Sequence, residues 1–140
     1  MKKRIVLFIS CLSMFYFSAN SFAQEKAKTE ITNVKQNAQT VEFTVESSTP
    51  FYYGGNVHIL HIGNKDFSHS KQSKTDGKGK LVFLIPVADW NALTDGTDVW
   101  VTYGNLFKTS NDEQTDIKAL CEKSPKCWYL GKFSPGLLKK

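Results

Sequence analysis

The stretch that decides the fold reads Thr40-Val41-Glu42-Phe43-Thr44-Val45-Glu46, in which apolar and polar side chains alternate. Successive side chains of a β-strand point to opposite faces, so Val41, Phe43 and Val45 share one buried face and the glutamates lie in water. Residues 30–35, just before it, predict a short edge strand. Together these segments indicate a sheet with one face packed on a core.

Two denser apolar segments predict strands nearer the middle of that sheet. Residues 56–62 are apolar or aromatic at nearly every position, as expected of a central strand, and residues 80–86 form another such run that ends at a proline. Residues 63–79 between them are polar and predict a long connection, with at most a short strand around Phe67. Within it, the lysine-rich part at 71–80 predicts a solvated hairpin loop.

The last strands are predicted at residues 98–103 and 128–133. The first alternates, with Val99, Val101 and Tyr103 on one face and Trp100 and Thr102 on the other. A short helix is predicted between them, because the segment at 111–114 has a capping pattern and Ile117, Leu120 and Cys121 follow at helical spacing. Pro125 ends that helix.

The whole pattern predicts one mainly β domain at residues 30–140, after a polar lead at 24–29. Five to seven strands separated by turns, with one short C-terminal helix, favour an antiparallel immunoglobulin-like β-sandwich. Residues 93–99 are similar to the turn that precedes strand F of fibronectin type III and immunoglobulin domains, although Val99 stands where those domains place a tyrosine. A small barrel and an α+β sheet are the alternatives.

Residues 1–23 have the three parts of a bacterial secretory signal peptide. Basic residues at 2–4 precede an apolar run at 5–17, and Ser21-Phe22-Ala23 offers small residues at the two positions that signal peptidase reads. A membrane anchor is an alternative, but the apolar run is shorter than the roughly 20 residues that span a bilayer. A lipoprotein signal would need Cys11, which lies inside the apolar run. We therefore expect export to the periplasm or the exterior, with no membrane span after cleavage.

Cleavage changes the charge balance of the protein. The chain carries 18 basic and 13 acidic residues, and removing the three basic residues at 2–4 leaves 15 against 13, a net charge of +2. Binding to nucleic acid needs a concentrated basic face, so nucleic acid is not an expected partner.

Cleavage also leaves two cysteines, Cys121 and Cys127, which predict one local disulfide in an exported protein. Their spacing and the aromatic residues that follow resemble the redox pair in the immunoglobulin-like periplasmic domain of a transmembrane thiol reductase. The resemblance covers residues 121–129 and implies thiol–disulfide exchange. It lacks the double proline of that domain, where Leu130 and Gly131 stand here. A structural disulfide is the first expectation and redox activity the second.

The sequence predicts no catalytic residue, metal site or cofactor. It contains no Gly-x-Ser-x-Gly elbow. His58 and His61 are three apart on a strand and point to opposite faces, so they cannot share one metal ion, and His69 lies in the polar connection. The acid pairs Asp95/Asp98 and Asp112/Asp116 stand at a turn and a helix start, where carboxylates act as turn formers and caps.

Aromatic residues offer the best candidates for a binding site. The chain after residue 23 holds 13 aromatic side chains, and six of them are not clearly assigned to the core: Tyr52, Tyr53, Trp90, Trp100, Trp128 and Tyr129. The first five are the candidate binding residues. We expect a non-catalytic binding or accessory module that recognises an envelope protein or glycan through them. If Trp90, Trp100 and Trp128 are all buried, the binding-face proposal fails. The alternatives are a periplasmic thiol–disulfide protein and a secreted inhibitor that presents the 121–127 ring.

Overall fold

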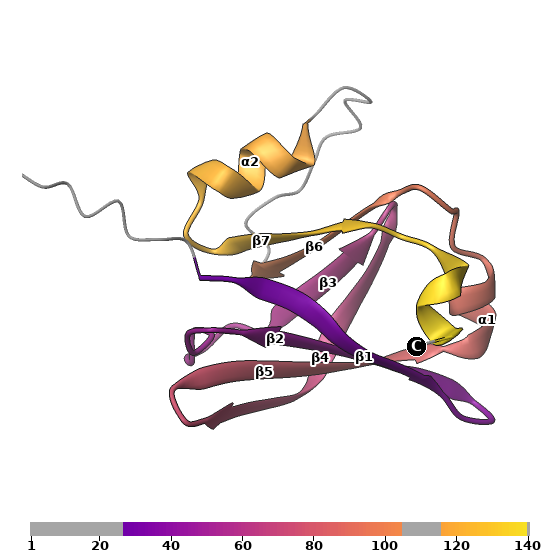
Figure 1. Cartoon of the computed structure of the whole chain (residues 1–140), viewed down its shortest axis with the longest axis horizontal. Helices are drawn as coiled ribbons and strands as arrows, with labels where there is room; N and C mark the ends of the chain where they lie inside the picture. Colours follow the sequence, from indigo (N-terminus) through magenta and orange to yellow (C-terminus); the bar gives the residue numbers. More distant parts are fainter. Residues whose placement is uncertain (1–26, 105–115, 140) are drawn as a thin grey trace, which may run out of the picture.

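The computed structural model of the chain describes residues 27–104 and 116–139. The predicted signal peptide at 1–23, the first half of the lead (24–26) and the capping pattern at 111–114 lie outside them. The described elements, in chain order, are β1 (Thr29–Gln36), β2 (Thr40–Ser47), β3 (His58–Ile62), β4 (Lys65–Thr75), β5 (Lys78–Pro86), α1 (Val87–Asn91), β6 (Asp98–Tyr103), α2 (Ile117–Lys123), β7 (Cys127–Lys132) and the 3-10 helix η1 (Pro135–Lys139) (Figure 1).

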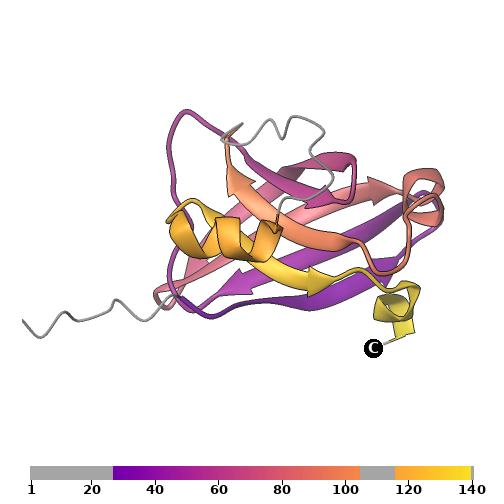
Figure 2. The ribbon, with the colours of Figure 1, turned by 90° about the horizontal axis from the view of Figure 1, so that it is seen from above.

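The seven described strands form one antiparallel sheet in the order β1-β2-β5-β4-β3-β6-β7. The sheet curls until β1 and β7, at its two ends, come into contact, which gives a half-barrel (Figures 1 and 2). Strand β4 pairs with β3 on one side and with β5 on the other. The predicted immunoglobulin-like sandwich is not confirmed, because β4 joins the two halves of the sheet into one continuous layer.

The polar segment predicted as a long connection is instead the longest strand, β4, in the middle of the sheet. Its side chains alternate between half-buried and exposed along the first half, so one face meets the core and the other meets water. A two-residue turn at Asp76 and Gly77, with φ values of 52° and 75°, joins it to β5. Asp-Gly is the preferred pair for such a turn because both positions need positive φ. The prediction was wrong because a strand with one solvated face can be almost entirely polar.

The concave side of the half-barrel holds the main core. The predicted inward positions Val41, Phe43 and Val45 of β2 are all fully buried, and β5 and β6 contribute alternate residues to the same core. Its fully buried aliphatic and aromatic members on the neighbouring strands are Leu60, Ile62, Leu81, Phe83, Ile85, Val99 and Val101. The alternation in the sequence therefore predicted this face correctly.

Helix α2 covers the convex side of β6 and β7, where a second small core forms (Figure 2). Ile117, Cys121 and Cys127 pack there against Trp100, while Val99, Val101 and Tyr103 of β6 face the main core. The N-cap is Asp116, whose carboxylate accepts the Ala119 N–H at 3.1 Å. Strand β6 is thus buried on both faces, and its side chains divide between the two faces as predicted. No helix in the described ranges is long and apolar enough to cross a membrane.

Candidate functional site

The loop between β2 and β3 brings aromatic side chains to one end of the half-barrel. Phe51 enters the core there, with its ring 5.2 Å from Trp128 and 5.5 Å from His58 between centroids. It can do so because Gly79 of β5 lies beneath it. A Cβ at Gly79 would come within 2.7 Å of the Phe51 backbone nitrogen and 2.8 Å of the Thr49 carbonyl oxygen. Glycine is therefore required where this loop crosses β5.

Tyr52 and Tyr53 follow Phe51 and are 43% and 58% exposed. The Tyr52 ring lies 5.5 Å from Tyr103 and 6.2 Å from Trp128, so its inner side rests on buried aromatic rings. Lys126 Nζ lies 6.0 Å from the Tyr52 ring centroid. With Val57, which is 47% exposed at the end of the same loop, these residues make an apolar surface with one cation. We call Tyr52, Tyr53, Val57 and Lys126 the Tyr52 surface.

Hydrogen bonds hold the loop at both of its ends. The side-chain amide of Gln72, on β4, donates to the Tyr52 carbonyl oxygen at 2.7 Å. The Gly104 N–H, just after β6, donates to the Val57 carbonyl oxygen at 2.8 Å. The exposed tyrosines are therefore fixed on the fold before any partner arrives, which lowers the entropy lost on binding.

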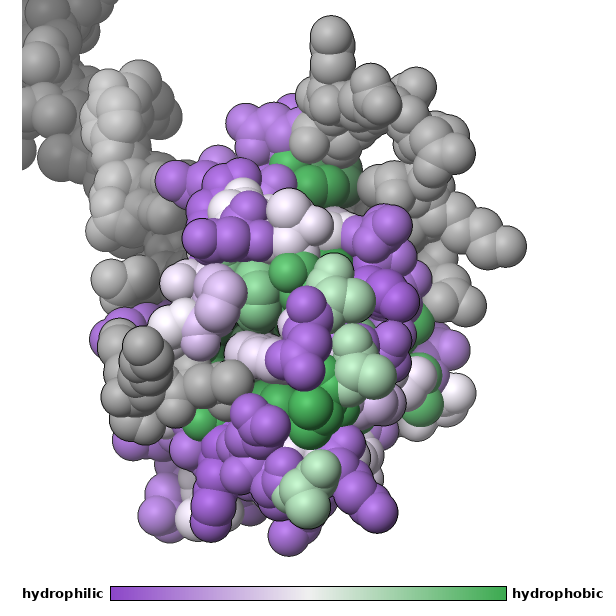
Figure 3. Space-filling model, turned by 90° about the vertical axis from the view of Figure 1, so that its right-hand side faces the viewer, coloured by the Kyte–Doolittle hydropathy of each residue, from purple (hydrophilic) through white to green (hydrophobic). Residues whose placement is uncertain are grey.

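The three tryptophans of the predicted site lie elsewhere and are all buried, with exposed fractions of 3% for Trp90, 7% for Trp100 and 8% for Trp128. Trp90 packs in the core at the opposite end, 5.0 Å from Phe133 between ring centroids. That end, which carries α1 and η1, shows some apolar surface surrounded by hydrophilic side chains (Figure 3). The predicted binding face built on the three tryptophans therefore fails, and Tyr52 and Tyr53 are the exposed residues of the predicted set.

His58 lies at the centre of the buried aromatic rings. Its ring is fully buried and lies 5.0 Å from Tyr103, 5.6 Å from His69 and 5.8 Å from Trp128 between centroids. Neither ring nitrogen has a hydrogen-bond partner among the residues that the structure describes. Burial first, and then the neighbouring His69, lowers the pKa of the His58 imidazole to about 4. His58 is therefore neutral near pH 7.

His61, on the opposite face of β3 as predicted, is in contrast fully partnered. Its Nδ1 lies 2.6 Å from a carboxylate oxygen of Asp66, and its Nε2 lies 2.8 Å from the hydroxyl of Thr102. The Thr102 hydroxyl also donates to the Gly104 carbonyl at 3.0 Å. Trp100 stacks flat on the imidazole, at 4.9 Å and 15°. Sequence reasoning missed this chain of hydrogen bonds because it did not recognise β4, which places Asp66 opposite His61.

A carboxylate, an imidazole and a hydroxyl in a chain are the parts of a nucleophilic catalytic triad. Here the Thr102 side chain is fully buried, and its hydrogen is directed to a backbone carbonyl. A nucleophile must reach its substrate, so this geometry suits a structural link between β3, β4 and β6. The described residues contain no group of three or more metal-ligating side chains that could hold a metal ion.

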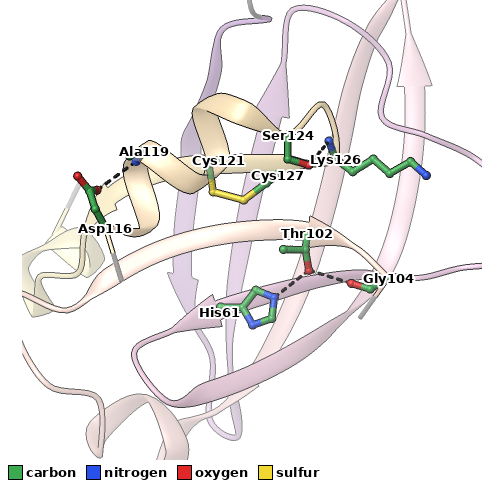
Figure 4. The surroundings of a disulfide bond; sticks show 9 residues. All are labelled: His61, Thr102, Gly104, Asp116, Ala119, Cys121, Ser124, Lys126 and Cys127. Atoms are coloured by element: carbon green, nitrogen blue, oxygen red, sulfur yellow. Dashed lines mark hydrogen bonds between the residues drawn. A yellow bond between two sulfur atoms is a disulfide. The ribbon is translucent and has the colours of Figure 1, made fainter. Parts of the chain in front are cut away.

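Cys121 and Cys127 form the predicted disulfide, which joins the end of α2 to the start of β7 (Figure 4). Their Cα atoms are 4.6 Å apart, and both residues are fully buried. Thiol–disulfide exchange requires a thiolate to reach one of the two sulfur atoms. Burial of both cysteines therefore favours the structural interpretation over the redox one.

A shallow hollow of about 220 Å³ lies between α2 and the starts of β1 and β7. Lys118 and Glu122 line it from the exposed face of α2, and Tyr129 lines it from β7. The Tyr129 hydroxyl donates to Asp98 at 2.8 Å. Burial and this hydrogen bond raise the pKa of Tyr129 to about 12, so its phenol stays neutral. The Tyr129 phenol is therefore poorly suited to proton transfer near neutral pH.

Comparison of the chain with protein-family models, with curated proteins and with solved structures gave no match in any of the three. The candidate site therefore rests on its own geometry, which is the exposed Tyr52 packed on a buried aromatic cluster and the exposed Tyr53 beside it in the loop.

Proposed function

We propose that this protein is an exported, non-catalytic binding module of the bacterial envelope or exterior, and that the Tyr52 surface contacts its partner. The observation that carries the proposal is the pair of exposed tyrosines in a loop that hydrogen bonds hold in place. Tyrosine is enriched among residues that dominate binding energy, since it offers a large rigid area and a polar tip.

A protein partner agrees best with the chemistry of this surface. Val57 adds aliphatic area, which suits an apolar side chain of another protein. Tyr103 and Lys126 already lie against the Tyr52 ring, which leaves less of it free for stacking on a sugar. An envelope glycan is the second possibility, with Tyr53 as the stacking residue.

The apolar segment at 5–17 and the disulfide support a site of action in the periplasm or outside the cell. Disulfides are stable in these compartments and rare in the cytosol. The fully buried cysteines do not favour the redox alternative, and the inhibitor alternative gains no specific support from the 121–127 ring.

Affinity capture from the envelope fraction of the source bacterium tests the proposal. The wild-type protein should retain a partner that the double variant Tyr52→Ala, Tyr53→Ala loses, with an affinity decrease of at least about 30-fold if the two residues are hot spots. Leu84→Ala is the matched control, since Leu84 is 46% exposed on β5 and lies outside the Tyr52 surface. That variant should retain the partner.

The same experiment separates the two partner classes. Protease treatment of the envelope fraction should abolish capture of a protein and leave capture of a glycan intact. Equal capture by the wild type and the double tyrosine variant would reject the Tyr52 surface as the contact.

A further inference from the structure

Two histidines on one short strand differ completely in their hydrogen bonding. His61 has a partner at each ring nitrogen, whereas both ring nitrogens of the fully buried His58 have none within residues 27–104 and 116–139. Buried polar atoms without partners are rare in folded proteins and call for an explanation. His58 also lies directly beneath the loop that carries the Tyr52 surface, because Phe51 packs on its ring.

We propose that His58 is an acid-sensitive latch: its protonation releases the loop at residues 51–57 and so disassembles the Tyr52 surface. The functional meaning of this switch, which is release of the partner in acid, rests on the proposed binding function. The physical effect, which is opening of the loop, does not.

Four rings of the described residues contact the His58 ring. The loop contributes Phe51, β7 contributes Trp128, and β6 contributes Tyr103. From β4, His69 accepts the backbone N–H of His58 at its Nδ1, at 2.9 Å. None of these groups is an anion.

The Tyr103 ring, which packs against His58, also lies near a cation, because Lys126 Nζ is 5.8 Å from its centroid. A protonated His58 would therefore be a buried cation, and the rings that contact it in the described ranges supply no carboxylate to pair with it. Water is then the available partner for its N–H groups, and water reaches the ring only if a neighbouring element moves away.

The loop is the neighbour held by the fewest interactions. Strands β4, β6 and β7, which carry the other contacting rings, are fixed by pairing on the sheet. The loop is outside the sheet and is tied by the Gln72 and Gly104 hydrogen bonds and by packing of Phe51 and Tyr52. Segments with few such ties open at lower free energy than the rest of a protein.

The sign of the effect follows from linkage. A histidine whose pKa is about 4 in the closed state and 6.5 when exposed binds protons more readily when open. The contribution of His58 to the free energy of the closed state is therefore complete above pH 6.5 and decreases as the pH falls toward 4. Between pH 7.5 and 4.5 the opening equilibrium constant should rise by about 70-fold.

Hydrogen exchange measured by NMR on the exported protein tests this directly. The Gly104 N–H reports on the loop because it donates to the Val57 carbonyl oxygen. After the intrinsic chemical rate is divided out, this amide should exchange about 70-fold faster at pH 4.5 than at pH 7.5. It should also exchange faster than the core amide of Phe43 at both pH values, which shows that the loop opens while the half-barrel stays folded.

Two variants keep the test decisive. His58→Phe fills the same space with a ring that cannot be protonated, and His58→Leu serves if the phenylalanine does not fit. Either should remove the acid acceleration in the loop. The proposal is wrong if wild-type loop exchange does not rise in acid, if the rise persists without His58, or if the loop and Phe43 exchange at one common rate.

The same protein separates failure of the latch from failure of the binding function. If the wild-type protein captures no partner at pH 7.5, only the proposed binding function of the Tyr52 surface fails. The hydrogen-exchange test of loop opening does not depend on that result. If capture succeeds, the partner should elute at pH 4.5 from the wild type and stay bound to His58→Phe. Elution from both proteins would reject the latch as the cause of release.

Discussion

Gly79 shows how one residue can position a candidate binding site that it does not touch. The loop that carries Tyr52 crosses β5 at this glycine, and Phe51 enters the core directly above it. Sequence reasoning placed a glycine within a predicted loop at 63–79 and gave it no role. Its importance depends on a contact between segments about 30 residues apart in the chain, which no local pattern encodes.

Replacing Gly79 by alanine should therefore destabilise the protein and disturb the Tyr52 surface. The new methyl group meets backbone atoms of Thr49 and Phe51, which cannot rotate away as a side chain can. We expect a loss of about 1–3 kcal/mol in the free energy of unfolding, measured with urea. Gly55→Ala is the control, because a Cβ at Gly55 meets nothing within 4 Å. Equal stability of the two variants would contradict the close crossing.

Thr102 makes the second prediction at this scale. Thr102→Val keeps the shape of the side chain but leaves His61 Nε2 and the Gly104 carbonyl without the hydroxyl that joins them. Buried polar groups left without partners cost about 1–3 kcal/mol, so urea unfolding should show a loss in that range. A catalytic role would predict an intact fold with a lost activity. A variant as stable as the wild type would show that the hydrogen-bonded chain adds nothing to stability.

At the scale of elements, the strands with strict alternation were predictable and β4 was not. The alternating residues of β2 and β6 predict which side chains face the core, because one face of each strand is apolar. The structure confirms both predictions. β4 has one solvated face and mostly polar side chains on the other, so its pattern resembles that of a loop. The Asp76–Gly77 turn was the available signal for the β4–β5 hairpin.

Helix α2 depends on the disulfide that holds its C-terminal end. The helix has seven residues, too few for independent stability, and it covers Trp100 on the convex face. Replacing both cysteines by serine should lower the free energy of unfolding by about 2 kcal/mol in the loop-entropy treatment, as measured by urea denaturation.

The same double variant distinguishes the three functional hypotheses. A binding module that uses the Tyr52 surface should keep its partner, because Tyr52, Tyr53 and Val57 lie on the β2–β3 loop and only Lys126 of that surface lies in the 121–127 ring. Strand β7, which carries Trp128 beneath Tyr52, stays paired with β6. A thiol–disulfide protein should lose all activity, and an inhibitor that presents the 121–127 ring should lose affinity steeply. Loss of capture at unchanged loop structure would therefore reject our assignment.

At the scale of the whole molecule, the sequence predicted a single mainly β domain but not its closure. Alternation tells which face of each strand is buried, yet the same faces can line a sandwich or a curled sheet. The choice here depends on β4, which pairs on both sides and prevents separation into two layers. The same holds for the candidate site. The sequence identified its aromatic residues, but which of them are exposed depends on how the sheet curls.

The stability of the whole protein should depend on pH through His58. Its pKa is lowered to about 4 in the folded state against 6.5 when unfolded, so the unfolded state takes up more protons. Stability is then complete above pH 6.5 and falls as the pH drops to 4, by up to about 3 kcal/mol. Urea unfolding at a series of pH values should show this fall in the wild type and a smaller one in His58→Phe. Parallel curves would assign the pH dependence to other groups.

The half-barrel has two different ends, and the chain leaves it at the end away from the Tyr52 surface. The loop at 51–57 joins the strands at one end, while η1 follows β7 to the other, beside α1 (Figure 1). A tag, dye or resin linkage added at the C-terminus would therefore point the tyrosines outward into solution. Attached in this way to a sensor chip, every molecule would present the same face to a passing analyte.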